Sequence, residues 1–365
     1  MMLTNLQNLL VFYILTTFLI SCTVMDSGRS DVQWLTFEEY PYYSTMGVQV
    51  GQEFELIENT KIWSRGGHNA FTDIIFFDDY FYIVFREASC CHFSEDGKVR
   101  ILRSKDTKVW EDVAELIVPN KDVRDPKLSI CPANTLCINA TARQPYSIFT
   151  NTNYIHQSYV WNSKDGVNWS DAKPILLRNY WLWRVRWNNE ADQAYGFSYR
   201  TGVPNYLNLH TSHNGIDFTT KQYRIFDAHR PNETDLVFIN DSTAIALVRR
   251  NLDANSIIGL SRSPFLEWRW EELNEKIASP NLLLLPDNRI IAGIRFLEPE
   301  ARTSIGLIDP VEKKITEILK LPSGGDNGYP GMILKDDELI ISYYSSHQQR
   351  TSIYLARVKL TLDSQ

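Results

Sequence analysis

The sequence predicts an all-β chain folded as a six-bladed β-propeller, and three observations support this fold class. Short runs of alternating apolar and polar residues, bounded by Asp, Asn, Gly and Pro, dominate, whereas helical periodicity is hard to find. A turn sequence built on Ser-x-Asp recurs about every 50 residues, the length of one four-stranded blade. Six units of three strands follow one another along the chain. Six blades are therefore expected, with five or seven as the alternatives.

The recurring turn is clearest in Ser104–Trp110 and Ser163–Trp169, which read SKDTKVW and SKDGVNW. A weaker copy is Ser212–Phe218, and a degenerate copy is Ser261–Trp268. In such a turn the Asp or Asn side chain caps the backbone, and Gly adopts a positive φ. We expect the aromatic ring that ends each copy to pack between blades.

Each unit opens with a segment that reads strand, turn, strand. These six hairpins are Phe71–Arg86, Asp125–Arg143, Arg184–Arg200, Thr234–Arg249, Pro280–Arg295 and Pro330–Tyr344. The third strands are Val99–Leu102, Ser158–Trp161, Tyr206–His210, Ser256–Leu260, Thr303–Ile308 and Thr351–Val358. The sixth unit ends after its third strand, so Glu53–Trp63 is the natural donor of its outer strand. This closure would leave no open sheet edge.

The N-terminal segment has the features of an export signal. Residues 1–21 carry no charge, and the apolar run from Leu9 to Ile20 suits a signal-peptide core but is too short to span a bilayer. Leu19-Ile20-Ser21-Cys22 resembles the lipobox of bacterial lipoproteins, although no Lys or Arg precedes the apolar run. An ordinary cleaved signal and an uncleaved anchor are the alternatives.

We therefore expect three parts: a lipoprotein signal peptide at 1–21, a tether at 22–50 and the propeller at 51–365. Cys22 would be lipidated, and this anchor would hold the protein in the cell envelope, at the outer membrane or in the periplasm. The alternative is secretion. The net charge of −7 argues against a nucleic-acid partner.

The later cysteines are Cys90, Cys91, Cys131 and Cys137. They lack zinc-site spacing and partnered histidines, so no metal site is expected, and no cofactor motif is visible. Export permits disulfides, and Cys131–Cys137 is a candidate, with buried free thiols as the alternative.

Strand direction predicts which face carries chemistry. Since consecutive strands are antiparallel, the starts of the first strands and the ends of the second strands share one face, opposite the Ser-x-Asp turns. The starts are Asp73, Asp125, Arg184, Glu233, Ser279 and Tyr329. The ends are Arg86, Arg143, Arg200, Arg249, Arg295 and Tyr343. This arginine set favours a pocket for a carboxylate or sulfate. The alternative is ion pairs between blades, with Asp73, Asp125 and Glu87 as partners.

Together these features resemble the sialidase superfamily. The Ser-x-Asp-x-Gly-x-x-Trp element looks like the Asp-box of those enzymes. Asn232-Glu233 followed by Arg249 is similar to the blade that carries their general base and a pocket arginine, and Gly328-Tyr329-Pro330-Gly331 resembles the segment with their tyrosine nucleophile. The resemblance implies Tyr329 as nucleophile, Glu233 as its base, and Arg249 and Arg295 as a carboxylate clamp.

The first unit departs from this family. Sialidases open with a Phe/Tyr-Arg-Ile-Pro motif, whereas His68–Asp73 contains no arginine. Arg86, Arg200 or His68 are the candidate substitutes. The family's acid/base aspartate lies in a loop of the first blade. Asp96 is the nearest candidate by position, followed by Asp73 and then His92.

Three functions are compatible with these residues. The first is an exo-glycosidase of sialidase type that removes an anionic terminal sugar. The second is a uronate lyase or a histidine-dependent glycosidase on the same fold, for which His68, His92, Tyr329 and the arginines could supply base and charge neutralisation. The third is a glycan-binding lipoprotein without catalysis. An anionic glycan is the expected partner in each case.

Overall fold

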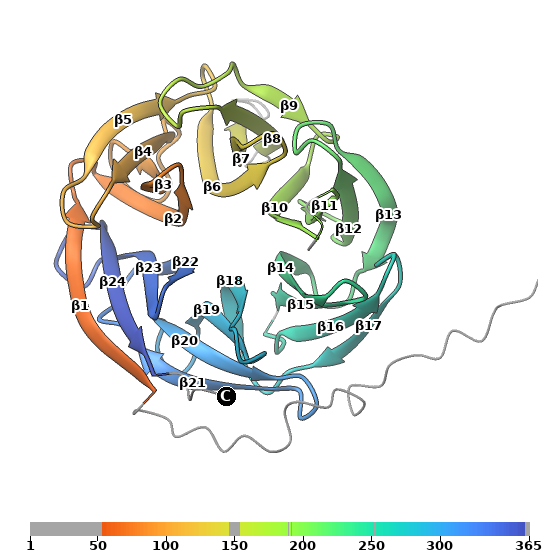
Figure 1. The fold of residues 1–365 in the computed structure, drawn as a ribbon. Helices are drawn as coiled ribbons and strands as arrows, with labels where there is room; N and C mark the ends of the chain where they lie inside the picture. The colour runs from red at the N-terminus through yellow and green to blue at the C-terminus, as the bar shows by residue number, and fades with distance from the viewer. Residues whose placement is uncertain (1–52, 146–153, 189, 191, 252, 362–365) are drawn as a thin grey trace, which may run out of the picture. The chain divides into compact units, whose positions relative to one another are not determined.

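The computed structural model describes residues 53–145, 154–188, 190, 192–251 and 253–361. These residues form 24 β-strands, arranged as six antiparallel sheets of four strands. The sheets follow one another as the blades of a ring (Figure 1). Within the described residues no helix is long and apolar enough to cross a membrane. The predicted all-β fold class and the blade count are confirmed.

Blades 1 to 3 are each made of four consecutive strands. Blade 1 contains β2 (His68–Phe77), β3 (Tyr80–Ala88), β4 (Lys98–Ser104) and β5 (Glu111–Leu116). Blade 2 contains β6 (Asp122–Cys131), β7 (Thr135–Pro145), β8 (Tyr154–Ser163) and β9 (Lys173–Ile175). Blade 3 contains β10 (Tyr180–Trp187), β11 (Ala194–Arg200), β12 (Leu207–Ser212) and β13 (Thr219–Phe226).

Blades 4 and 5 follow the same order, and blade 6 combines both ends of the described chain. Blade 4 contains β14 (Pro231–Asn240), β15 (Thr243–Arg250), β16 (Ile257–Arg262) and β17 (Trp268–Glu272). Blade 5 contains β18 (Ile277–Leu284), β19 (Ile290–Phe296), β20 (Arg302–Asp309) and β21 (Lys314–Lys320). Blade 6 contains β22 (Asn327–Lys335), β23 (Glu338–Ser345), β24 (Ser352–Leu360) and β1 (Phe54–Trp63).

The ring is closed by β1, as the sequence predicted. This strand pairs antiparallel with β24, from Phe54 opposite Leu360 to Trp63 opposite Ile353. It lies at the rim of blade 6 beside β24 (Figure 1). The closing sheet therefore joins strands from opposite ends of the sequence, and the backbone of β24 is paired on both sides.

Every innermost strand has a register irregularity near its start. Two residues there oppose one residue of the next strand, the arrangement of a β-bulge. The six bulge pairs are Phe71–Thr72, Asp125–Pro126, Trp183–Arg184, Asn232–Glu233, Ser279–Pro280 and Tyr329–Pro330. Four bulges begin with a residue at positive φ, namely Phe71, Asp125, Ser279 and Tyr329. Because bulges redirect side chains, these positions build the site on one face of the ring.

The recurring turns join the third and fourth strands of blades 1 to 4, on the opposite face. In the second copy, Asp165 Oδ1 accepts hydrogen bonds from the backbone N of Val167 at 2.9 Å and of Asn168 at 2.8 Å. Gly166 has a φ of 69°, and Trp169 Nε1 donates to its carbonyl. The Asp side chain caps the turn here, and these turns belong to the scaffold.

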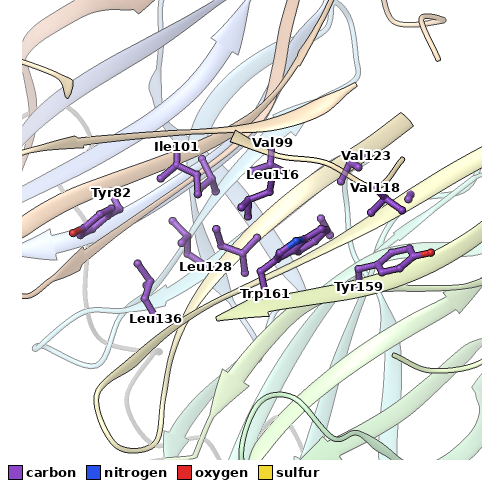
Figure 2. Close-up of a cluster of buried hydrophobic side chains, with 14 of the residues drawn as sticks. Tyr82, Val99, Ile101, Leu116, Val118, Val123, Leu128, Leu136, Tyr159 and Trp161 are labelled. Atoms are coloured by element: carbon purple, nitrogen blue, oxygen red, sulfur yellow. The ribbon is translucent and has the colours of Figure 1, made fainter. Parts of the chain in front are cut away.

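The hydrophobic core is divided among the contacts between neighbouring blades. Figure 2 shows one such cluster, in which Val99 and Ile101 of blade 1 meet Leu128, Leu136 and Trp161 of blade 2. Trp161 is 2 % exposed. Each blade therefore buries apolar side chains against the next, and this packing holds the inner strands in place.

Some predictions fall outside the described residues. These are the signal peptide at 1–21, the lipidation at Cys22 and the tether at 22–50. The candidate disulfide does lie within the described part, where Cys131 and Cys137 are bonded. Cys90 and Cys91 are free thiols and are exposed.

Candidate active site

Tyr329, Glu233 and Arg249 form a hydrogen-bonded group, in which Glu233 and Tyr329 lie near the starts of β14 and β22 and Arg249 lies near the end of β15. The phenol of Tyr329 donates to Glu233 Oε1. Arg249 Nη1 donates to the same oxygen at 2.9 Å, and the backbone N of Ser279 donates to Oε2 at 2.6 Å. Glu233 is only 2 % exposed, so these donors take the place of water around its carboxylate. A carboxylate held this way can accept the proton of Tyr329.

Side-chain hydroxyls from blades 1 and 5 fix the backbone of Tyr329 in place. The residue has a φ of 51° at its bulge. Its N donates to Ser279 Oγ at 3.0 Å, and its carbonyl accepts from Thr72 Oγ1 at 2.8 Å. Desolvation of the phenol, followed by the negative charge of Glu233, raises the pKa of Tyr329 well above its usual value. Tyr329 is therefore a neutral phenol near neutral pH.

Aromatic rings surround the phenol. The ring centroid of Tyr329 lies 4.7 Å from that of Phe71, 5.4 Å from Trp183 and 5.9 Å from Tyr344. Lys127 Nζ lies 5.6 Å from the Tyr329 ring centroid and 4.6 Å from that of Trp183. Lys127 is 1 % exposed, and burial lowers its pKa to about 8. Charged and aromatic groups together thus form the surroundings of the phenol.

Arg295 comes from β19 and is partly exposed. Its Nε is buried without a hydrogen-bond partner among the described residues. Gly328 lies against it, because a Cβ at that position would be 3.1 Å from Arg295 Cδ, and its φ is 122°. Any larger residue at Gly328 would be strained and would press on the arginine. This guanidinium is available to an anionic ligand.

Arg86 and Arg143 do not have the acid partners that the sequence suggested. Both bind Asp122, at 2.7 Å each, and Arg124 Nε binds the same carboxylate at 2.6 Å. The remaining nitrogens of Arg86 contact His68 Nδ1 and the carbonyl of Ser94. Arg86 is 0 % exposed, so the predicted substrate-binding role does not fit its position. Although burial acts in the opposite direction, the guanidinium groups of Arg124 and Arg86 hold the pKa of Asp122 below its usual value.

Two other predicted residues are engaged elsewhere. Both carboxylate oxygens of Asp73 accept hydrogen bonds from Arg184 Nη1, at 2.9 Å each. Asp73 Oδ2 also accepts one from the backbone N of Leu128 at 2.8 Å. Asp73 is 2 % exposed and therefore acts as a structural partner of Arg184, not as an acid. Arg200 Nη1 donates to the carbonyl of Pro204 at 2.6 Å, within its own blade. The structure does not bring either residue to the phenol of Tyr329.

Asp96 and Glu87 also have local partners. Asp96 is exposed in the loop after β3, where its Oδ1 accepts from the backbone N of Ser89 at 3.3 Å. Glu87 binds the side chain of Arg100, 3.2 Å from Nε, so it does not neutralise the arginines at the ends of the second strands. Asp125, the third suggested partner, forms no ion pair with another described residue.

His68, His92 and Asp326 lie together beside Phe71. One possible ligand atom of each lies within 4.8 Å of the others, a spacing that a metal ion could bridge. His68 Nδ1 is 3.1 Å from Arg86 Nη1, and its Nε2 is 2.9 Å from Asp326 Oδ2. Since arginine only donates, His68 Nδ1 must accept from Arg86, and His68 Nε2 must carry the proton and donate a hydrogen bond to Asp326. A metal at Nε2 would reverse this arrangement, so the contacts favour a hydrogen-bonded group.

A cavity of about 750 Å³ opens next to this group. Its lining includes His68, His92 and Asp326, together with Arg65 and Arg350. Tyr344 connects the two regions, because its hydroxyl donates to Asp326 Oδ1 at 2.9 Å and its ring packs on Tyr329. Tyr329 itself is not among the residues that line this cavity.

Several residues of the site were not singled out from the sequence. Lys127, Trp183 and Tyr344 lie in strands that look like ordinary β-sheet, and Asp326 directly precedes β22. Phe71 occupies the bulge of blade 1, and the Arg124 guanidinium carbon lies 5.6 Å from its ring centroid. A charged residue inside an inner strand, as in Arg-Asp-Pro-Lys at 124–127, was the one available signal.

No protein-family model and no curated protein matches the chain. Among solved structures, a protein of unknown function from Dyadobacter fermentans is similar, with a TM-score of 0.73 and 18 % identity. The match covers 85 % of this chain and 100 % of that one.

Two sialidases are also similar. Trypanosoma rangeli sialidase, solved with the inhibitor DANA, gives a TM-score of 0.58 at 12 % identity over 80 % of this chain. The matched part spans 55 % of that enzyme, about half its length. The NanB sialidase of Streptococcus pneumoniae gives 0.60 at 10 % identity, over 85 % of this chain and 71 % of that one. At these identities the comparisons establish a sialidase-like fold.

Proposed function

We propose that this protein is an exo-glycosidase of sialidase type that removes a terminal sugar carrying a carboxylate. The observation that carries the proposal is the hydrogen bond from Tyr329 to Glu233, with Arg249 on the same carboxylate oxygen. A tyrosine paired with a buried carboxylate is an activated nucleophile, and sialidases are the glycosidases that use one.

The reaction begins when Tyr329 Oη attacks the anomeric carbon while Glu233 takes its proton. A neutral phenol approaches a substrate carboxylate with less repulsion than an anionic nucleophile would meet. The covalent glycosyl-tyrosine is then hydrolysed by water, and Glu233 returns the proton to Tyr329. Two successive displacements at one carbon retain its configuration.

The substrate carboxylate would bind Arg295 and the outer nitrogens of Arg249. Arg295 has no acidic partner among the described residues, whereas one Nη of Arg249 is committed to Glu233. The stretch His68–Asp73, which resembles the opening segment of sialidases, contains no arginine, so the substrate acid has fewer cations here. Arg124 lies over Phe71 and is the nearest replacement on that side.

The two alternative functions are less well supported. A lyase with His68 as base would need His68 and Tyr329 on either side of the sugar. Phe71 instead lies between them, with its centroid 6.0 Å from His68 and 4.7 Å from Tyr329. Pure glycan binding would not require a phenol paired with a buried carboxylate. The uncharged N-terminal segment and Cys22 support the further proposal that the enzyme works at the cell envelope.

The test is a substrate panel for the purified protein and its Tyr329→Phe variant. Sialosides and uronic-acid oligosaccharides are incubated with each, and both free sugar and the ultraviolet absorbance of unsaturated uronates are measured. Release of an acidic monosaccharide by the wild type but not by the variant supports the proposal. A rise in the absorbance of unsaturated uronates would instead identify the protein as a lyase. Binding of a glycan without turnover would indicate a glycan-binding protein without catalysis.

A further inference from the structure

Cys90 and Cys91 are successive residues of the loop between β3 and β4, and both are exposed free thiols. Cys131 and Cys137, in contrast, are bonded to each other. Two thiols on successive residues stay close, because a single peptide unit joins them. The proposed glycosidase reaction uses neither thiol, and neither Tyr329 nor Glu233 lines the cavity beside them.

A tight turn holds the two cysteines. The hydroxyl of Ser94 accepts hydrogen bonds from the backbone N of Cys90 at 3.2 Å and of Cys91 at 3.0 Å. The backbone N of Ser94 donates in return to the carbonyl of Cys91 at 3.0 Å. Since these backbone groups are bonded within the turn, the two thiols remain on its exposed outer side.

Arginines of blades 1 and 2 anchor the loop directly after the cysteines. Arg124 Nη2 donates to the carbonyl of His92, and Arg86 Nη2 donates to that of Ser94 at 2.8 Å. Arg143 Nη2 donates to the same Ser94 carbonyl at 3.4 Å. The loop is thus tied to the strands of both blades, and this keeps the two thiols at the edge of the cavity.

The cavity that both cysteines line also contains two arginines. Its volume is about 750 Å³, and Arg65 and Arg350 lie in its wall. Arg350 Nη1 donates to the carbonyl of Ser64 at 3.4 Å, and Arg65 Nη1 lies 3.9 Å from a carboxylate oxygen of Asp112. Both contacts are long, so both guanidinium groups can bind an additional anion.

The acidic residue among the described residues of the cavity wall is already hydrogen-bonded. Asp326 accepts from His68 Nε2 and from the hydroxyl of Tyr344, at 2.9 Å each. His92 also lines the cavity, and burial lowers its pKa to about 4, so it is neutral near pH 7. A small molecule with carboxylate groups would therefore meet two guanidinium groups beside the thiols.

Cys91 is the better nucleophile of the pair. A hydrogen bond from the backbone of Phe93, followed by one with the side chain of Cys90, lowers the pKa of the Cys91 thiol. The same contact between the two side chains raises the pKa of Cys90. Because the thiolate is the reactive form, attack on a disulfide begins at Cys91.

We propose that Cys90 and Cys91 form a reversible redox site, which a small disulfide carrying carboxylate groups, of the glutathione disulfide class, oxidises to a disulfide between the two cysteines. The Cys91 thiolate attacks one sulfur of the donor, forms a mixed disulfide and releases the first donor thiolate. The Cys90 thiolate then attacks the Cys91 sulfur, and the second donor thiolate leaves. The protein loses two electrons and two protons, and the donor takes up both to become two thiols.

The bond formed in this way is readily reduced. Consecutive Cα atoms are about 3.8 Å apart across a trans peptide, closer than the roughly 4.4–6.8 Å of most disulfides. A ring closed over a single peptide unit is therefore strained, and strained, exposed disulfides are the labile ones. The site can thus cycle between the dithiol and the disulfide.

The experiment exposes the full chain, with Cys90 and Cys91 reduced, to glutathione disulfide. Remaining thiols are then alkylated, and the peptide that contains both cysteines is examined by mass spectrometry. We expect this peptide to lose both alkylation sites and to weigh about 2 Da less than the dithiol peptide. Dithiothreitol should restore both sites. A peptide that stays alkylated at both cysteines, or that carries glutathione as its final product, would overturn the proposal.

Single variants test the order of the two steps. Cys90→Ser and Cys91→Ser each keep one thiol of the pair, so their reaction should stop at the mixed disulfide with glutathione. Cys90→Ser retains the more reactive thiol and should form this adduct about threefold faster or more than Cys91→Ser. Thermal unfolding checks that both variants are folded. Equal or reversed rates would overturn the assignment of Cys91 as the attacking thiol.

The charge of the donor tests the role of the arginines. Arg350→Met should slow oxidation by glutathione disulfide about threefold or more. It should leave the rate with cystamine unchanged, because that disulfide carries amino groups and no carboxylates. Arg178→Met is the control variant, since Arg178 is exposed and lies outside the cavity lining. Equal slowing with both donors, or in both variants, would overturn the selection of a carboxylate-bearing donor.

Discussion

Tyr329 donates a hydrogen bond to Glu233 from a position 96 residues further along the chain. The two residues belong to blades 6 and 4, and blade 5 lies between these blades in the ring. Ser279 of blade 5 joins them, since its backbone N binds Glu233 and its hydroxyl accepts from the backbone of Tyr329. Three successive bulges thus build the candidate nucleophile and its base as one unit.

Replacing Glu233 by Gln should remove the proton acceptor of Tyr329 while keeping the side-chain shape. We expect kcat to fall about 10²- to 10⁴-fold, the usual contribution of a positioned base. Steady-state kinetics on an aryl glycoside of the acidic sugar measures this, because that substrate needs no help with its leaving group. A Gln variant with wild-type kcat would remove Glu233 from the reaction.

Arg295→Met should weaken binding of substrates that carry a carboxylate. A charge-assisted contact contributes about 1.5–3 kcal/mol, so KM should rise about 10- to 100-fold. The matched substrate is the same glycoside with a neutral carboxamide, for which variant and wild type should differ little. Arg200→Met is the control variant, because that guanidinium is directed to Pro204. A similar loss for both arginines would argue against a specific carboxylate site.

Asp122→Asn should destabilise the fold severely. The carboxylate is fully buried and balances Arg86, Arg124 and Arg143, which would then repel one another. Breaking a buried ion pair from one side costs about 3–5 kcal/mol. Urea unfolding measures the change, with Asp217→Asn as the control. Asp217 pairs with Lys173 at the surface, where the expected loss is at most about 1 kcal/mol after screening by solvent. Comparable losses for both variants would contradict the assignment.

Acid should destabilise the protein through His210. This histidine is 0 % exposed and lies between the hydroxyls of Ser198 and Thr220. Burial lowers its pKa to about 3, so between about pH 6.5 and 3 the unfolded chain binds the proton that the folded chain refuses. The free energy of unfolding should therefore decrease as the pH is lowered through that window, by at most about 1.4 kcal/mol per pH unit.

The matching variant for this effect is His210→Gln, examined by urea unfolding between pH 4 and 7. It should be less stable than wild type at neutral pH but should lose less stability on acidification. Parallel curves for the two proteins would show that His210 does not contribute to the acid sensitivity.

The blade architecture was predictable because it depends on local patterns. Each blade is a run of consecutive strands, so periodic turns and hairpins reveal it, and the missing outer strand of the last unit indicated β1. Tyr329 and Glu233 were found through resemblance to a family. The arginine partners could not be found in this way. The sequence placed the start of this strand at Asp125, whereas β6 begins three residues earlier, at Asp122. As a result Asp122, and not Asp125, is the carboxylate that binds Arg86.

The interior of the site was predicted least well. Register and strand direction place a residue on a face, but they do not say which side chains fill the space between six blades. Lys127 was not singled out from the sequence, yet its Nζ lies 4.6 Å from the ring centroid of Trp183 and 5.6 Å from that of Tyr329. Such convergence depends on the bulges, and a bulge has no reliable signature in a single sequence.

The pairing of β1 with β24 also determines when the molecule can be completed during synthesis. Blades 1 to 5 can each assemble from neighbouring strands as they emerge, whereas β1 is made before all of them and its partner is the last strand described. A nascent or truncated chain therefore presents β1 as an unpaired strand, which is open to proteases and to pairing with other chains. Ring closure in this way depends on β24 having been made.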